Sequence, residues 1–312
     1  MSGRNKAFVG GVVWTAFAIF ALRRGQPLDV THVLLAFAAL VLAPLLLELI
    51  LAEDRTRLAG WLLRLQLPAA ILLTAAFVAP AGAPAAFAAL PWLMITAMLA
   101  VAGLTGLMLG RWRKSLGRGC ESIAMFYAGI AGLWVFADRA GLRPLGFDAE
   151  IVALTAVHFH FAGWILPAIT GLVIDRQPES RLGSLAAIGV VLGVPAVALG
   201  ITLAQLGWGS ALETAAGCGL AIAGMAVAIL QVRIATEARV HGSARILLLV
   251  AGASLFVGMF LAVIYALRTT ALPVPRLDLG AMRALHGVIN AVGFGLCGLI
   301  GWRIALTPDV RN

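Results

Sequence analysis

Long apolar stretches alternate with short charged clusters along the whole chain. Ten of these stretches approach or exceed the roughly 20 residues that a helix needs to cross a bilayer. Each stretch is continuously apolar rather than alternating, which favours helices over barrel strands, because a segment in lipid must satisfy its own backbone hydrogen bonds. The expected spans are residues 7–22, 30–51, 61–79, 86–108, 121–138, 150–174, 184–206, 211–232, 245–267 and 280–303.

This pattern predicts an all-α fold, a polytopic transmembrane helix bundle of about ten spans. Composition agrees, since 62% of the 312 residues are hydrophobic and 12% are charged, against about 25% charged residues in soluble domains. No loop between the expected spans exceeds about a dozen residues, so no soluble domain fits. We expect a single membrane domain over residues 1–312, weakly subdivided at a basic loop into four helices in 1–110 and six in 120–304.

Lysine and arginine are unequally distributed over the two sides of the expected bundle. With ten spans, 16 lie on the side of the termini and 7 on the other. The smaller set is Arg23, Arg24, Arg139, Arg143, Arg268, Arg276 and Arg283. Because positive residues accumulate in cytoplasmic loops, we expect both termini in the cytoplasm of a bacterial cell and the chain in its inner membrane.

Other broad classes fit the sequence less well. The net charge of +9 is dispersed through short loops instead of forming one stripe, which argues against a nucleic-acid partner. The first apolar run resembles the core of a signal peptide but has no clear small-residue cleavage site before Arg23, so we interpret it as a retained helix. Cys120, Cys218 and Cys297 are widely separated and form no metal or redox motif.

Two histidines interrupt one of the apolar spans. His158 and His160 lie in a run that has no charge between Glu150 and Asp175. At about 1.5 Å per residue, both are expected roughly 12 to 15 Å from the outer face, near the bilayer midplane. Ionisable groups at that depth are costly and usually functional, so this pair defines a candidate site.

Helical geometry separates the roles of these two histidines. Positions i and i+2 differ by about 200° on a helix, so both rings cannot face one ligand without a distortion. His160 shares a face with Trp164 and is the expected site residue, whereas His158 is expected to bond a neighbouring helix. Pro167 predicts a kink around Gly163, which would open room for a ligand.

The last span carries a second polar pair. His286 and Asn290 are four residues apart and therefore lie on one helix face. The amide is expected either to set the tautomer of the ring or to address a substrate together with it. Glu213, in the first turn of another span, would favour a protonated histidine, although a carboxylate there also complements the helix dipole.

Aromatic and peripheral polar residues complete the candidate set. Tyr127, Trp134 and Trp164 are expected to line an apolar substrate pocket. His32 and Glu48 fall near the outer and inner ends of one span, where Glu48 is expected to pair at the surface. Metal binding by the three intramembrane histidines with Glu213 is an alternative, but their spacing is not diagnostic.

The segments 155–163 and 286–295 resemble the YndJ-like family of bacterial integral membrane proteins. The likeness covers the part of the chain from about residue 150 to 304. The resemblance implies a membrane protein and raises a transporter as one function, but it implies no mechanism or site residue. Larger members carry a soluble region after the membrane part, which is expected to be absent from a chain that ends at Asn312.

Three functions remain open at this stage. The first is a membrane-embedded enzyme for acid/base chemistry, such as isomerisation or cyclisation, on a lipophilic substrate that enters from the bilayer, with His160 and His286 exchanging protons and Asn290 orienting the substrate. The second is a small-molecule or proton-coupled transporter. The third is a haem or quinone redox protein with histidines as axial ligands. No cofactor is favoured.

Overall fold

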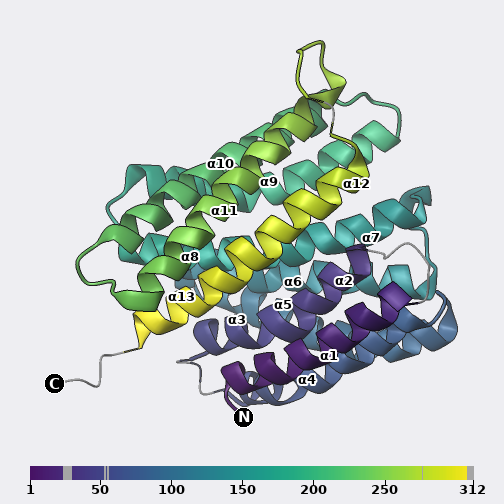
Figure 1. The fold of residues 1–312 in the computed structure, drawn as a ribbon, viewed down its shortest axis with the longest axis horizontal. Coiled ribbons are helices and arrows are strands. Elements are labelled where there is room, and N and C mark those ends of the chain that lie inside the picture. Colours follow the sequence, from purple (N-terminus) through teal and green to yellow (C-terminus); the bar gives the residue numbers. More distant parts are fainter. Residues whose placement is uncertain (24–29, 53, 55, 276, 308–312) are drawn as a thin grey trace. The chain divides into compact units, whose positions relative to one another are not determined.

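The computed structural model describes residues 1–23, 30–52, 54, 56–275 and 277–307. Within these residues, ten helical spans are long and apolar enough to cross a bilayer, as expected from the sequence (Figure 1). The continuous spans are α1 (Gly3–Arg23), α4 (Arg57–Val78), α5 (Ala83–Met108), α6 (Leu116–Ala140), α9 (Arg181–Gln205), α10 (Ala211–Thr236) and α11 (Gly242–Ala266).

Three further spans are built from several segments. The second span joins α2 (Val30–Phe37), η1 (Ala38–Leu42) and α3 (Ala43–Ile50). The sixth joins α7 (Ala149–His158), η4 (Phe159–Ile165) and α8 (Leu166–Arg176). The tenth contains α12 (Leu279–Ala281), η6 (Met282–His286), η7 (Ile289–Leu296) and α13 (Cys297–Leu306). Short 3₁₀ turns are η2 (Arg111–Arg113), η3 (Pro144–Gly146) and η5 (Leu267–Thr269), the last of which extends α11.

The helices begin earlier and end later than several of the expected spans. The first begins at Gly3 rather than residue 7, and α6 begins at Leu116 rather than residue 121. The expected spans were ended at charged residues. A helix can continue past such a residue, because a long basic side chain near its end extends to the membrane interface. Arg24, Arg55, Arg276 and Arg311, used in the charge comparison, lie outside the described residues.

The chain divides into two compact units. Unit 1 contains Met1–Arg111 and Glu121–Ile165, and unit 2 contains Trp112–Cys120 and the chain from Leu166 onward. The sixth span contributes to both, because the division falls at the end of η4. The histidine pair of span six therefore belongs to unit 1, whereas His286 and Asn290 belong to unit 2.

The second span forms the centre of unit 1. Its most apolar window is 83% buried, the highest value among the ten spans described, and it packs against α1, α4 and α7. Gly10 brings α1 close to this span, since a Cβ there would overlap the main-chain carbonyl of Leu40. Small residues permit such close approaches in membrane helices, where dispersion contacts replace the hydrophobic effect.

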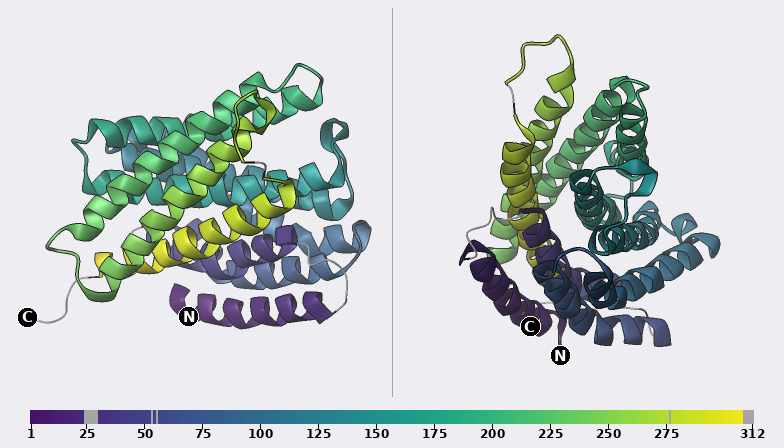
Figure 2. Two further views of the ribbon diagram at one scale, coloured as in Figure 1. Left: turned by 45° about the horizontal axis from the view of Figure 1, so that its top comes forward. Right: turned by 90° about the vertical axis from the view of Figure 1, so that its right-hand side faces the viewer.

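In unit 2, α9, α10 and α11 pack as consecutive neighbours (Figure 2). Several glycines of these helices lie at their contacts: a Cβ at Gly189 would meet Ala223 at 2.8 Å, and one at Gly224 would meet Met259 at 2.7 Å. Spans η6, η7 and α13 then pack along α11. These two glycines therefore allow close helix packing.

Four π-helical segments interrupt the composite spans: η1, η4, η6 and η7. Two of them share a pattern, since Pro44 and Pro167 each lie two residues after the end of a π segment. Proline has no N–H for the carbonyl four residues earlier, which here belongs to Leu40 or Gly163, inside the π segment. The distortion expected around Gly163 thus takes the form of a wide turn, a feature common at functional sites. Pro68, Pro91 and Pro195 lie inside uninterrupted α-helices, so a proline alone does not produce it.

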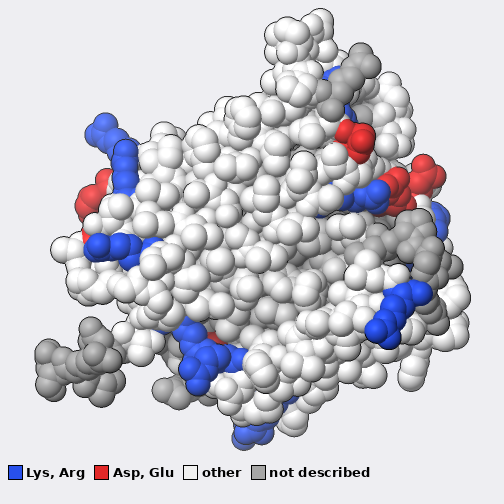
Figure 3. Space-filling view, viewed as in Figure 1, with Lys and Arg blue, Asp and Glu red and all other residues white. Residues whose placement is uncertain are grey.

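On the face that Figure 3 shows, charged side chains lie mainly toward the edges, and a wide area between them is uncharged. Large apolar side chains such as Met94, Leu192 and Ile222 are exposed in the middle of their helices. Such a surface is suited to lipid rather than to water.

Candidate functional site

The tenth span and α11 form a polar contact that involves His286. Its Nδ1 lies 2.8 Å from the carbonyl oxygen of Gly258. Because a carbonyl oxygen only accepts, Nδ1 carries the hydrogen and donates it, and the neutral ring then has its lone pair on Nε2. Nε2 has no hydrogen-bond partner among the residues that the structure describes. This nitrogen is therefore available to take a proton or bind a ligand.

Asn290 lies one turn further along the same span and is only 7% exposed. Its Nδ2 donates to the main-chain carbonyl of His286 at 2.8 Å, and its Oδ1 is buried with no partner in the described part of the chain. The sequence placed the two residues on one face, which this bond confirms. The tautomer, however, is set by Gly258 and not by the amide, because only the carbonyl on α11 reaches the ring.

Gly258 makes this contact geometrically feasible. A Cβ at this position would lie 2.7 Å from Asn290 Oδ1 and closer still to Nδ2. The same glycine thus accepts from the ring of His286 and leaves room for Asn290. One turn earlier on α11, Ser254 faces Gly293 of η7 in the same way. The close contact between α11 and η7 therefore requires glycine at positions 258 and 293.

Glu213 has a different partner from the one expected. Arg268 donates to its Oε1 at 2.7 Å, and the guanidinium of Arg268 also stacks 3.9 Å above the ring of Tyr265. The carboxylate lies in the first turn of α10. Its described ion pair joins the ends of two helices and involves no histidine.

His160 is fully buried, with 0% exposure. Its Nδ1 donates to the carbonyl of Ala156 at 2.8 Å, and its Nε2 accepts from the indole N–H of Trp92 at 3.2 Å. The Ala156 carbonyl fixes the hydrogen on Nδ1, so the ring is neutral and both nitrogens are used. In this arrangement His160 joins span six to α5, and its only nitrogen lone pair already accepts the hydrogen bond from Trp92.

The other residues expected beside His160 also lie in unit 1. Trp164 shares the face of His160, with ring centroids 6.4 Å apart, and its buried indole N–H has no partner in the described structure. Tyr127 contacts Phe159 edge to face, and Trp134 stacks on Phe147 at 6.2 Å. Tyr127 thus packs on the sixth span, and Trp134 packs on the turn that precedes it.

His158 ends α7, and His160 is the second residue of η4. The ring of His158 lies edge to face against Phe159, with centroids 5.4 Å apart. Each of His160 and His286 has its hydrogen bonds inside its own unit. The structure thus brings His286 and Asn290 together in unit 2, and His160 and Trp164 together in unit 1.

No group of three or more His, Cys, Asp or Glu side chains among the described residues is arranged to hold a metal ion. Cys120, Cys218 and Cys297 form no disulfide within the part of the chain that the structure describes. An axial haem ligand would need a free nitrogen, and His160 uses both of its own in bonds to Ala156 and Trp92.

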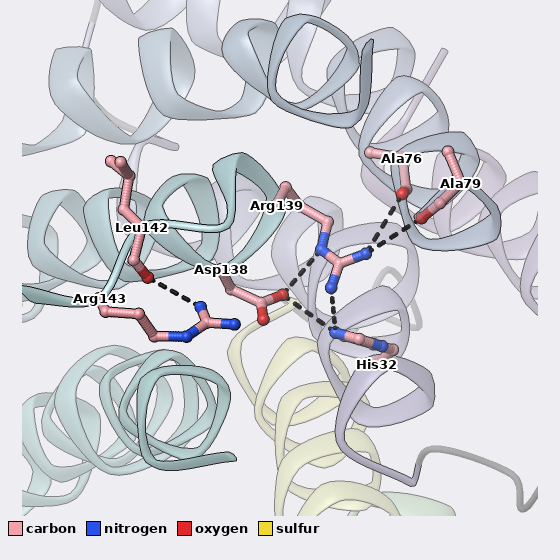
Figure 4. A network of polar contacts seen from close by, with 7 residues as sticks. All are labelled: His32, Ala76, Ala79, Asp138, Arg139, Leu142 and Arg143. Carbon is pink, nitrogen blue, oxygen red and sulfur yellow. Dashed lines mark hydrogen bonds and ion pairs between the residues drawn. The ribbon is translucent and has the colours of Figure 1, made fainter. Parts of the chain in front are cut away.

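A buried charged network in unit 1 was not anticipated from the sequence (Figure 4). Asp138 and Arg139, in the last turn of α6, are 5% and 6% exposed. Arg139 Nε donates to Asp138 Oδ2 at 2.7 Å, and His32 Nε2 lies 3.0 Å from that same oxygen. In the sequence analysis Arg139 appeared only as one of the positive residues in the loops between spans. The available signal was an adjacent Asp and Arg just before Gly141, which ends the helix with a positive φ of 71°.

A second polar cluster surrounds a cavity of about 90 Å³ in unit 1. Lys6 Nζ donates to the carbonyl of Leu63, and Glu48 accepts from the main-chain N–H of Gly3 at 3.0 Å. Gln66 donates to the Ala39 carbonyl at 2.6 Å, leaving its buried Oε1 without a partner in the described residues. Glu48 thus pairs at a helix end, in accordance with the expectation for it.

Ten apolar spans, charged ends and buried polar contacts define a polytopic α-helical membrane protein. The profile of the YndJ-like protein family matches residues 33–294, so the chain belongs to this family. The match begins well before residue 150, where the resemblance was first seen. The chain is 30% identical over 220 residues to the uncharacterized membrane protein YndJ of Bacillus subtilis (strain 168). This match covers 69% of the chain and 38% of that protein. No solved structure matches the chain.

Proposed function

We propose that this chain is a membrane-embedded enzyme that carries out acid/base chemistry on a lipophilic small molecule, with His286 as the proton-transferring residue. The observation that carries the proposal is the bond from His286 Nδ1 to the Gly258 carbonyl. It leaves the Nε2 lone pair available, as a general base requires. Of the two histidines expected to exchange protons, only His286 has such a nitrogen.

The surroundings of His286 suit a reversible proton transfer. When Nε2 takes a proton, the Gly258 carbonyl continues to accept from Nδ1 and stabilises the imidazolium through a charge-assisted bond. Asn290 binds the main chain of His286 and so holds the wide turn that carries the ring. In this role Asn290 positions His286 rather than touching the substrate.

An isomerisation or cyclisation needs no second substrate, because the proton that the base removes is returned to another atom of the same molecule. A lipophilic substrate reaches such a site from the bilayer. Location in a bacterial inner membrane with cytoplasmic termini is part of the same proposal and rests on the charge distribution.

The test uses purified full-length protein in detergent and lipid extract from a strain that lacks it. A new product, detected by mass spectrometry, is expected without any sealed compartment. His286→Ala should lower turnover by about 10²- to 10⁴-fold, the usual contribution of a general acid or base. His241→Ala is the matched control, because His241 is an exposed histidine at the start of α11.

Two outcomes would contradict the proposal. Full turnover in His286→Ala would remove the assigned role. Movement of a solute into sealed liposomes, without chemical change and lost in the same variant, would instead establish the transporter alternative. An absorption spectrum of the same preparation tests the haem form of the redox alternative, which requires a Soret band that is lost in His286→Ala.

A further inference from the structure

His32 makes two contacts of equal length that cannot both be hydrogen bonds. Its Nε2 lies 3.0 Å from Asp138 Oδ2 and 3.0 Å from the NH2 group of Arg139 (Figure 4). An arginine nitrogen only donates and an ionised carboxylate only accepts. A protonated Nε2 therefore bonds Asp138 and faces another donor, whereas an unprotonated Nε2 bonds Arg139 and faces another acceptor.

We propose that His32, Asp138 and Arg139 form a proton-binding site in which one proton on His32 Nε2 decides which partner it bonds. The ligand of this site is H⁺. The bond from Arg139 Nε to Asp138 Oδ2, at 2.7 Å, is the same in both states. Only the hydrogen bond between His32 on α2 and the pair on α6 changes: Nε2 donates to Asp138 when it is protonated and accepts from Arg139 when it is not.

Proton binding has a structural consequence for a third helix. Arg139 NH1 lies 3.4 Å from the carbonyls of Ala76 and Ala79, at the end of α4. These contacts are long for hydrogen bonds. When Nε2 takes a proton, NH2 loses its acceptor, and the guanidinium shortens its bonds to these carbonyls. The proton thus transfers Arg139 from α2 to the C-terminus of α4, where a cation is favoured.

The ring of Phe77 limits how far the groups can move. It stacks on His32 at 4.7 Å between ring centroids and lies 5.5 Å from the Arg139 guanidinium carbon. Both groups therefore contact the ring of Phe77, which favours a nearby cation. The charged groups that contact His32 in Figure 4 come from α6. Helices α1, α4 and α7 pack against α2 and could bring other charges near His32. The last turn of α1 contains Arg23, and the first turn of α7 contains Glu150. The last turn of α4, which contains Phe77, has no charged residue.

Nitrogen NMR of the full chain in lipid nanodiscs tests the site directly. The protein has five histidines, and selective ¹⁵N labelling reports the protonation of each ring nitrogen. The His32 signals are identified by their loss in His32→Gln, which retains a donor and an acceptor but does not titrate. We expect His32 Nε2 to change between protonated and unprotonated states within about pH 5 to 8, the range in which histidine titrates.

Two variants separate this site from a purely structural network. Asp138→Asn should displace the midpoint of the His32 transition by about one pH unit or more, since a charge at this distance has such an effect. Asp148→Asn, at an exposed aspartate whose side chain caps no helix, should leave it unchanged. A wild-type His32 that keeps one state throughout the pH range overturns the proposal, whether or not the variants fold. Equal displacement in the two variants also overturns it.

Discussion

The Nδ1 nitrogen of His286 lies 2.8 Å from the carbonyl oxygen of Gly258, and the Cα of this glycine adjoins the amide of Asn290. One residue on α11 therefore positions both polar groups of span ten. A carbonyl is available at any residue, but the space for Asn290 exists only at glycine.

Gly258→Ala should destabilise the protein and impair the site together. The added methyl overlaps the Asn290 amide, and overpacking of a closed contact costs about 1–3 kcal/mol. Thermal unfolding in detergent measures the loss. Gly219→Ala is the control, because no atom lies within 4 Å of its Cβ position on α10, and alanine there should stabilise the helix by up to about 1 kcal/mol. Equal effects of the two changes would refute the contact.

His160→Leu should destabilise unit 1 because the Trp92 N–H loses its acceptor. An unsatisfied buried donor costs about 1–3 kcal/mol. The double variant with Trp92→Phe removes both partners and should cost less than the sum of the single changes, with a coupling of about 0.5–3 kcal/mol. Additive effects on the unfolding free energy would mean that the 3.2 Å contact contributes nothing.

Glu213→Gln should change stability by less than about 1 kcal/mol. The Glu213–Arg268 pair is partly exposed, with side chains 18% and 30% accessible, and such pairs contribute little. Turnover should also stay within a few-fold of wild type, because the described bond of Glu213 is to Arg268. A loss of turnover as large as that of His286→Ala would show that Glu213 acts in the site together with His286.

Cysteine labelling in intact cells tests the expected topology. After replacement of the native cysteines by alanine, Leu142→Cys in the exposed turn after α6 should react with a membrane-impermeant maleimide. Ser2→Cys and Glu179→Cys, also at exposed positions, should react only after the cells are opened. Labelling of Ser2→Cys in intact cells would reverse the predicted orientation.

The positions of the spans and the shared faces of nearby residues were predictable. Apolar length identified all ten spans, and helical periodicity paired His286 with Asn290 and His160 with Trp164. The partners across helices were not predictable. No pattern along the chain indicates that Gly258 would accept from His286, or that Trp92 would donate to His160, because these residues are 28 and 68 positions apart.

The network of His32, Asp138 and Arg139 was not predicted, for the same reason. Asp138 and Arg139 are adjacent, but His32 is more than 100 residues away. In the sequence, Arg139 therefore counted only as a loop charge. Its burial results from the simultaneous approach of α2, α4 and α6.

By itself, the sequence determined that this chain is a ten-span helical membrane protein, because transfer of long apolar segments into lipid depends on composition and length alone. It also determined which polar residues share a helix face, since the helical repeat is local. Only the tertiary structure decided that His286 retains an available nitrogen while His160 does not. The reason is that a hydrogen bond requires two groups within about 3 Å, and helix packing alone brings distant residues that close.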